Sequence, residues 1–321
     1  MSFTSSASSL PSPDFEVASA FPEAVRLRQD AAAGDWASVR QYVDSLPQGT
    51  DRSFATSVLA EIPGVEQSLR ELVAADPDDV FALTVLGARE IEAGWEIRTG
   101  ARAKDVSREQ FAAFHAHLRE AEKLLIRATA LDPSYDAAWA ERLNTARGLE
   151  LGQNEARRRY DRLAAHHPHH FTGQARLLQQ LCPKWGGTWQ AAHGFAQECL
   201  RNAPDGALNG GLVAEAHLEH WADLRTSQER AAYLRQPHVH AELVEAAERS
   251  VLHPDFRPAH AYGWVTVQGC FAALFSLIGD RARAAVHFRA LGNLASEYPW
   301  SYLGKPADAY VKYRDAALAG G

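Results

Sequence analysis

Apolar residues recur at spacings of three and four along much of the chain, which is the pattern of helices with one buried face. Alanine is abundant, whereas isoleucine and valine, which strands favour, are scarce. We therefore predict an all-α fold. The expected helices form seven pairs and one last helix: 20–33 with 35–46, 51–60 with 64–75, 80–99 with 107–131, 135–150 with 153–166, 170–181 with 188–202, 208–224 with 237–252, 257–278 with 280–296, and 305–319.

The second helix of several pairs ends at a proline, and three of these prolines are almost evenly spaced. Pro133 and Pro168 are 35 residues apart, and Pro204 follows 36 residues later. Helix-turn-helix repeats have units of about 34 residues. Small or apolar residues stand twelve, eight and five positions before each proline: Ala121, Leu125 and Ala128, then Ala156, Tyr160 and Leu163, then Ala192, Ala196 and Cys199.

These positions resemble the tetratricopeptide repeat (TPR), whose second helix carries small and large apolar residues at the same offsets and ends at proline. The resemblance implies an α-solenoid of about six or seven helical hairpins plus a capping helix, with a concave groove. The last two units depart from the pattern, because Glu242 and His287 occupy the position of the alanine. We expect a disordered arm over 1–18 and a single superhelix over 19–321.

Two further segments go beyond this repeat pattern. They are GWEIRTG at 94–100 and PKWGG at 183–187. With the spacing between them, they resemble a bacterial domain-of-unknown-function family in which a W-x-x-R-G stretch precedes a P-K-W-G-G turn. The resemblance covers about 70–210, and it implies a helical-repeat fold without assigning an activity.

The PKWGG turn has a structural and a functional interpretation. Pro183 can end a helix, the two glycines allow a tight turn, and Trp185 can plug that turn against the next repeat. Alternatively, Lys184, Trp185 and Trp189 form an amphipathic patch at the mouth of the groove, since tryptophan often anchors binding.

The first motif leaves two interpretations open as well. Trp95, Glu96 and Arg98 could hold the polar end of a partner, with the arginine taking a carboxylate. Alternatively, Arg98 pairs with Glu92 and only fixes the insertion in place.

Histidine is frequent, with 14 residues, so metal binding has to be considered. His217 and His220 lie three apart on one predicted helix and are the best metal candidates. The Glu-x-x-His pairs of di-metal bundles are absent from the sequence. We therefore expect no metal site and no cofactor.

Composition and charge narrow the class of protein. The formal net charge is -7, which disfavours nucleic-acid binding because that needs a dense basic face. Three cysteines are too few for a disulfide framework, so we expect a cytoplasmic protein. Cys182 beside Lys184 could be a reactive thiol or a buried apolar residue.

The segment 261–279 carries no charged residue and is therefore a candidate membrane span. Gln268, two internal glycines and charged flanks favour a helix buried in protein instead, so we expect no membrane association. The same uncharged helix could also provide a self-association face, which makes a homodimer an expectation.

Known catalytic signatures are absent from the sequence, so an enzyme is uncertain and less expected than a binding protein. The leading hypothesis is a non-catalytic scaffold that recognises a peptide or partner protein in a concave groove. The alternative is an enzyme or small-molecule sensor whose pocket is covered by an insertion over 94–107.

Overall fold

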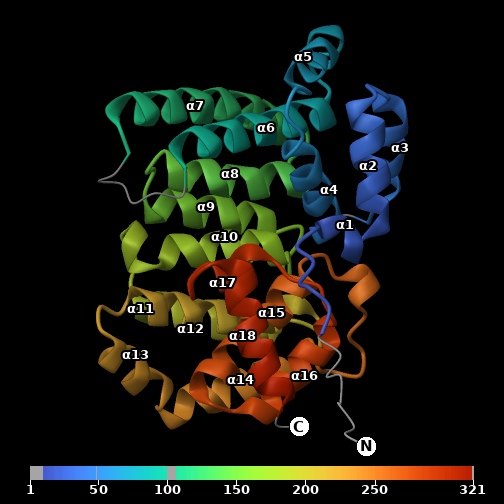
Figure 1. Ribbon diagram of the computed structural model, residues 1–321. Coiled ribbons are helices and arrows are strands. Elements are labelled where there is room, and N and C mark those ends of the chain that lie inside the picture. Colours follow the sequence, from blue (N-terminus) through green and yellow to red (C-terminus); the bar gives the residue numbers. More distant parts are fainter. Residues whose placement is uncertain (1–9, 48, 100–105, 320–321) are drawn as a thin grey trace, which may run out of the picture. The chain divides into compact units, whose positions relative to one another are not determined.

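The computed structural model describes residues 10–47, 49–99 and 106–319, which form helices joined by turns and short loops (Figure 1). Within these ranges there is no β-strand, and Asp14 and Leu294 form an isolated bridge. The all-α prediction is therefore confirmed.

The helices group into two compact units. The N-unit comprises Phe21–Pro204 and Arg257–Tyr262, and the C-unit comprises Met1–Ala20, Asp205–Phe256 and Gly263–Gly321. The prediction of a single superhelix over 19–321 concerns both units together and stays a prediction.

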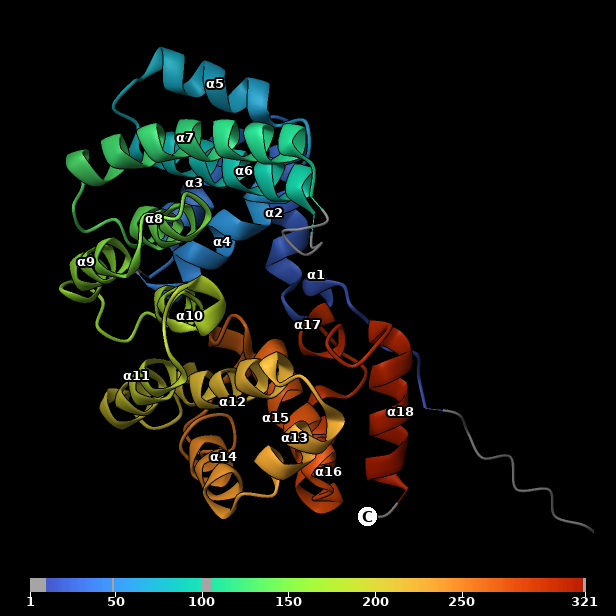
Figure 2. The same cartoon turned by 90° about the vertical axis from the view of Figure 1, so that its left-hand side faces the viewer.

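The N-unit contains the helices of the first five predicted pairs, each within a few residues of its expected position. From α6 to α11, each helix packs against the next one in the chain, and α8 also contacts α6 and α10. Figure 2 shows α8, α9 and α10 nearly end on. The elements are α2 (Pro22–Ala32), α3 (Trp36–Ser45), α4 (Thr50–Ala60), α5 (Glu66–Ala75), α6 (Val80–Arg98), α7 (Arg108–Leu131), α8 (Asp136–Gly148), α9 (Gln153–Ala164), α10 (Phe171–Leu181), the 3₁₀ helix η2 (Pro183–Trp185), α11 (Trp189–Asn202) and the 3₁₀ helix η4 (Pro258–His260).

The repeat positions that the sequence singled out form the interior of this stack. All nine of the small or apolar residues before Pro133, Pro168 and Pro204 are buried. Polar residues start the helices, as in α7, where Ser107 and Gln110 form a capping box. Burial of one face and capping of the ends explain why these segments are helical.

Glycines allow the helices around α7 to approach closely. A Cβ atom on Gly148 of α8 would lie 2.4 Å from Leu118 Cδ1, and one on Gly87 of α6 would lie 2.9 Å from Leu125 Cγ. A larger residue at either position would push α7 away. The close packing brings the last turns of α6 and α8 near the first turns of α7.

The C-unit is built around α15. This helix packs against α12, α13, α14, α16, α17 and α18. The elements are α1 (Val17–Ala20), the 3₁₀ helix η3 (Leu208–Gly210), α12 (Gly211–Asp223), α13 (Ser227–Leu234), α14 (Pro237–Arg249), α15 (Trp264–Ile278), α16 (Arg281–Leu291), α17 (Glu297–Trp300) and α18 (Pro306–Leu318).

The sequence-based helix positions were less accurate in this unit. The helix expected over 257–278 begins only at Trp264, because Gly263 has a φ of 102° and interrupts the helix before it. The expected helix 280–296 ends at Leu291. Helix α13, whose first turn is fixed by a capping box of Thr226 and Glu229, was not predicted.

Part of the predicted N-terminal arm is held against the C-unit. The Asp14 amide donates to the Asn293 carbonyl over 2.7 Å, and Arg314 Nη1 donates to the Pro11 carbonyl over 2.6 Å. The prediction of a disordered arm through residue 18 is therefore wrong for its second half, because backbone and guanidinium hydrogen bonds fix it. Residues 1–9 lie outside the described residues.

The uncharged segment 261–279 is a buried helix rather than an exposed face. Eleven residues of α15, from Trp264 to Phe275, are buried within the C-unit. Because these residues are buried, α15 offers no broad exposed surface for self-association. The homodimer stays a prediction, and no surface is assigned to it. In the described part of the chain, no helix has both the length and the apolar character needed to cross a membrane.

Candidate functional site

The N-unit contains a cavity of about 570 Å³ at the place where several helices end. The last turns of α6 and α8, the first turns of α7 and the C-terminal end of α10 surround it. The lining residues are Trp95, Arg98, Phe111, Phe114, His115, Arg147, Gly148, Glu150, Gly152, Gln180, Lys184 and Trp185. Four of the six candidate residues from the sequence thus lie around one cavity.

The first motif forms the end of α6. Trp95 and Arg98 stand three residues apart, so both project from one face of the helix. The Arg98 guanidinium carbon lies 5.2 Å from the Trp95 ring and 5.8 Å from the Phe111 ring of α7. Thr99, with a φ of 63°, ends the helix. Gly100 of the motif lies outside the described residues.

The PKWGG motif forms the 3₁₀ turn η2 between α10 and α11. Pro183 starts this turn, and Gly186 takes a left-handed conformation with a φ of 85°. A Cβ atom on Gly187 would lie 2.0 Å from the Leu181 carbonyl oxygen, so only glycine fits there. The structural interpretation therefore accounts for the proline and both glycines, while Lys184 and Trp185 line the cavity.

Two glutamine amides, one buried and one half-buried, hold the turn in place. Gln153 Nε2 donates to the Trp185 carbonyl over 2.9 Å, and Gln180 Nε2 donates to the same oxygen over 3.1 Å. The backbone of Trp185 is thereby fixed to both α9 and α10. This fixes the position of its indole at the cavity.

Arg147, in the last turn of α8, connects the two motifs. Its guanidinium carbon lies 5.8 Å from the Trp95 ring and 5.6 Å from the Trp185 ring. Phe111, Arg98, Trp95, Arg147 and Trp185 thus alternate ring and guanidinium, and we call these five residues the arginine–ring ladder. Each such contact contributes about 0.5 to 1 kcal/mol where it is exposed to solvent.

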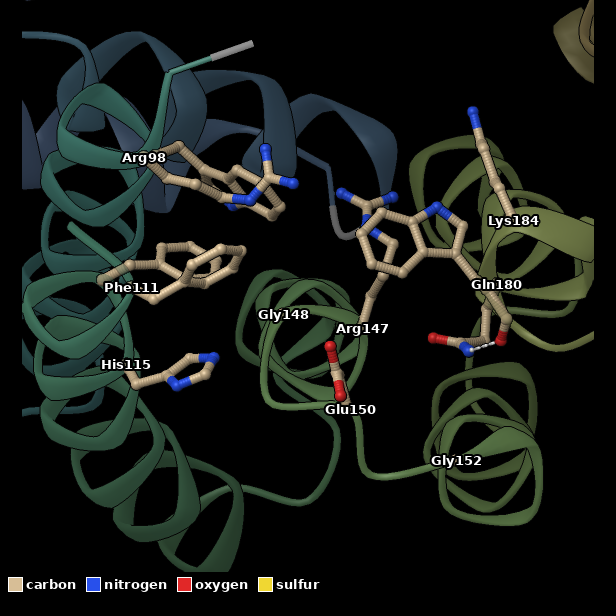
Figure 3. Close-up of a pocket in the computed structure, with 12 residues that line it drawn as sticks. Arg98, Phe111, His115, Arg147, Gly148, Glu150, Gly152, Gln180 and Lys184 are labelled. Atoms are coloured by element: carbon tan, nitrogen blue, oxygen red, sulfur yellow. Dashed lines mark hydrogen bonds between the residues drawn. The ribbon is translucent and has the colours of Figure 1, made fainter. Parts of the chain in front are cut away.

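Figure 3 shows how the labelled side chains lie around the cavity. The guanidinium groups of Arg98 and Arg147 extend toward the same region between α6 and α8. Glu150 lies below Arg147 in this view, and Lys184 extends away along the rim. The cavity therefore has guanidinium groups at its centre and an ammonium group at its edge.

The acceptors of the cavity are Glu150 and Gln180. Glu150 is exposed, and its carboxylate makes no hydrogen bond or ion pair within the described ranges. Gln180 is 4% exposed, and no donor among the described residues reaches its Oε1 atom. Its oxygen points toward the centre of the cavity in Figure 3.

Two predicted site residues lie elsewhere. Glu96 follows Trp95 by one residue, which turns it away from the cavity, and its carboxylate accepts from Arg89 Nη2 over 2.8 Å. Trp189 begins α11, and its ring lies 6.2 Å from that of His193, centroid to centroid. The PKWGG turn therefore separates Trp189 from Trp185.

The histidine candidates for metal binding have protein partners. In the C-unit, His217 Nδ1 lies 2.6 Å from the Tyr233 hydroxyl, and its Nε2 lies 3.0 Å from Glu242 Oε2. Burial, together with neighbouring His217, lowers the pKa of His220. The His220 ring lies 4.3 Å from that of Tyr233. Both histidines thus contact protein groups, and the expectation of no metal site stays a prediction.

A buried serine, histidine and aspartate also meet in the N-unit. His170 Nε2 lies 3.2 Å from Ser53 Oγ and 3.5 Å from Asp136 Oδ2, while Nδ1 accepts from the Gly173 amide. In a catalytic triad, the serine and the aspartate contact opposite ring nitrogens. Here both the serine and the aspartate face Nε2. The three residues therefore link α4, α8 and α10 but do not have the geometry of a catalytic triad.

Cys182, considered as a reactive thiol, is fully buried, and its thiol donates to the Leu178 carbonyl over 3.4 Å. This placement fits the buried apolar interpretation. No protein-family model matches the chain, and no curated protein matches it either. The resemblance to the TPR and to the domain-of-unknown-function family therefore stays a prediction.

Proposed function

We propose that this protein is a non-catalytic binding protein whose N-unit takes the carboxylate-bearing end of a peptide or partner-protein segment into its cavity. The observation that carries the proposal is the arginine–ring ladder, which joins the two motifs of the sequence in one cavity. The rings lie against the Arg98 and Arg147 guanidiniums, and the planar, charged guanidinium is a group that suits a carboxylate. Each guanidinium also donates within the protein, Arg98 Nη1 to the Thr99 carbonyl and Arg147 Nη2 to Asn144 Oδ1.

The packing of the N-unit supports a solenoid as the scaffold for this site. Consecutive helices pack in chain order, and the TPR positions of three units are buried. We propose that these hairpins are TPR-like. In that arrangement the cavity lies where the first helices of three pairs, α6, α8 and α10, end.

The arginines of the cavity also have a purely structural explanation. The binding proposal therefore has to account for something that this explanation does not. Arg98 and Arg147 lie in the last turns of helices, where a cation offsets the partial negative charge of the carbonyls. That explanation accounts for an arginine at each helix end. It does not account for an open cavity of about 570 Å³ between the arginines.

Calorimetric titration tests the proposal. The probes are dipeptide and tripeptide mixtures ending in Phe, Trp or Leu, each prepared with a free carboxylate and as the carboxamide. We expect saturable binding of free-carboxylate peptides and at least about tenfold weaker binding of the carboxamides. Arg98→Ala and Arg147→Ala should produce a similar loss.

A matched variant shows whether the loss of binding is specific to the arginines of the cavity. Arg157 on α9 also lies over a ring, 5.7 Å from Tyr160, and pairs with Asp161, but it does not line the cavity. Arg157→Ala should bind as the wild type does. Equal binding of carboxylates and carboxamides, or no saturation up to about 10 mM of any peptide, would contradict the proposal.

The volume of the cavity favours a second candidate, a small-molecule sensor. Cavities of roughly 300 to 1,000 Å³ are typical of small-molecule sites, and this one lies within that range. The predicted cover over 94–107 is only partly described, because residues 94–98 belong to α6 and 100–105 lie outside the described residues. A metabolite screen by melting temperature tests this candidate.

A further inference from the structure

The acceptor side of the cavity carries an inference about the ligand itself. A peptide carboxylate at Arg98 and Arg147 would leave Glu150 and Gln180 unused. Gln180 Oε1 is buried, with no donor among the described residues within hydrogen-bond distance. A buried acceptor left without a partner destabilises the protein, so a ligand that supplies a donor there gains affinity.

Glu150 makes the acceptor side charged. Its φ of 54° places it in the left-handed region just after α8, and its carboxylate faces the cavity below Arg147 (Figure 3). The carboxylate has no ion pair within the described ranges. An ammonium group of a ligand would therefore find a carboxylate and an amide oxygen at this side of the cavity.

The charge of the whole cavity argues against a strongly anionic ligand. Three cations line it, but Glu150 opposes them. The last turns of α6, α8 and α10 add about half a negative charge each. The cations are therefore nearly balanced, and a phosphate-rich ligand would find little excess positive charge.

The apolar lining completes the description of the ligand. Phe111 and His115, one turn apart on α7, have ring centroids 6.1 Å apart and lie beside Arg98 (Figure 3). Phe114 is buried and packs against the Trp95 ring with centroids 4.6 Å apart. A large apolar or aromatic side chain would pack against Phe111 and His115.

We infer that the cavity binds a short zwitterionic peptide as a whole. The carboxylate lies at the guanidiniums of Arg98 and Arg147, and the free amino group lies at Glu150 and Gln180 Oε1. The C-terminal side chain packs against Phe111 and His115. This inference rests on the proposed function, and it adds that the protein also recognises the amino group of the ligand.

One dipeptide series tests the inference separately from the function. Ala-Phe is titrated in four forms: free, N-acetylated, C-amidated and blocked at both ends. We expect the free form to bind at least about tenfold more tightly than either singly blocked form. Glu150→Gln should weaken binding of the free form by a similar factor and leave the N-acetylated form unchanged.

The variants are chosen so that folding does not decide the result. Glu150 is exposed, and Glu120→Gln, at an exposed carboxylate of α7 outside the cavity, is the matched control. Tighter or equal binding of the N-acetylated form, with no effect of Glu150→Gln, overturns this inference and leaves the proposed function standing. Equal binding of free and amidated forms, or no binding of any form, overturns both.

Discussion

Both units place a nitrogen-bearing side chain between aromatic rings, with opposite results for its charge. In the N-unit, Arg147 lies between Trp95 and Trp185 at an open cavity, and a guanidinium keeps its proton at any physiological pH. In the C-unit, His287 lies against Phe271 and Phe275, with ring centroids 5.2 and 5.6 Å away.

The difference lies in solvent access. His287 is fully buried, and burial lowers its pKa to about 3, so the imidazole is neutral. Its Nδ1 lies 2.5 Å from Gln268 Oε1, and no donor or acceptor among the described residues reaches Nε2. The rings around His287 thus enclose a neutral group in the core, whereas the rings around Arg147 lie against a charged group at a cavity.

The largest expected effect is on the packing of the two ring clusters. Phe271→Ala should lower the free energy of unfolding by about 3 to 5 kcal/mol, because the ring is fully buried. Phe111→Ala, at the half-buried ring of the ladder, should cost about 1 kcal/mol. Urea denaturation measures both changes. Equal losses would show that the rings of the ladder contribute as much to stability as the buried rings around His287.

The next effect concerns the turn that positions Trp185. Gly187→Ala should destabilise the N-unit by about 2 to 3 kcal/mol, because the added Cβ overlaps the Leu181 carbonyl. Gly186→Ala is the control, since it meets no atom within 4 Å and carries only the strain of its positive φ, about 1 kcal/mol. Hydrogen exchange of α10 and η2 reports the change. Similar exchange in both variants would show that the turn tolerates a side chain at Gly187.

The pH dependence of stability should distinguish the two kinds of ring cluster. The pKa of His287 is about 3 in the folded state and 6.5 in the unfolded state. The unfolded chain therefore binds the extra proton first as the pH falls. The contribution of His287 is complete above pH 6.5 and is lost between there and about 3, by about 1.4 kcal/mol per pH unit.

His287→Gln tests this dependence, because glutamine cannot titrate but can still donate to Gln268. Its free energy of unfolding should fall less steeply below pH 6.5 than that of the wild type. Urea denaturation at a series of pH values measures the slope. Parallel curves for the two proteins would mean that folding does not lower the pKa of His287.

The smallest effect on stability is expected at the arginines of the cavity. Arg147→Ala should lower the free energy of unfolding by about 1 to 2 kcal/mol, because it removes two partly solvated ring contacts. Thermal denaturation measures this change alongside Arg157→Ala. A loss as large as that of Phe271→Ala would identify Arg147 as a structural residue of the N-unit rather than a binding residue.

Much of this arrangement could be predicted from the sequence. The 3.6-residue periodicity and the proline stops placed all ten α-helices of the N-unit within two residues at their starts and at their ends. The motifs also pointed to Trp95, Arg98, Lys184 and Trp185 as neighbours in function, and the structure places all four around one cavity.

The rest depends on contacts between distant segments. Arg147 belongs to no sequence motif, and its contacts with the two indoles depend on how α8 packs, which includes the close approach of Gly148 to Leu118. Trp189 was assigned to the patch because it is close to Trp185 in sequence. The two residues lie in different elements, however, because η2 ends at Trp185 and α11 begins at Trp189 after the two glycines. The short helix α13 was missed because its apolar residues do not follow a clear helical period.

The most direct test of the binding site is the calorimetric titration of free-carboxylate peptides into the wild type, Arg147→Ala and Arg157→Ala. If the arginine–ring ladder forms the site, the wild type and Arg157→Ala bind with the same affinity, and Arg147→Ala binds at least about tenfold more weakly. If all three proteins bind equally, or none binds, the ladder is only a structural contact between α6, α8 and η2.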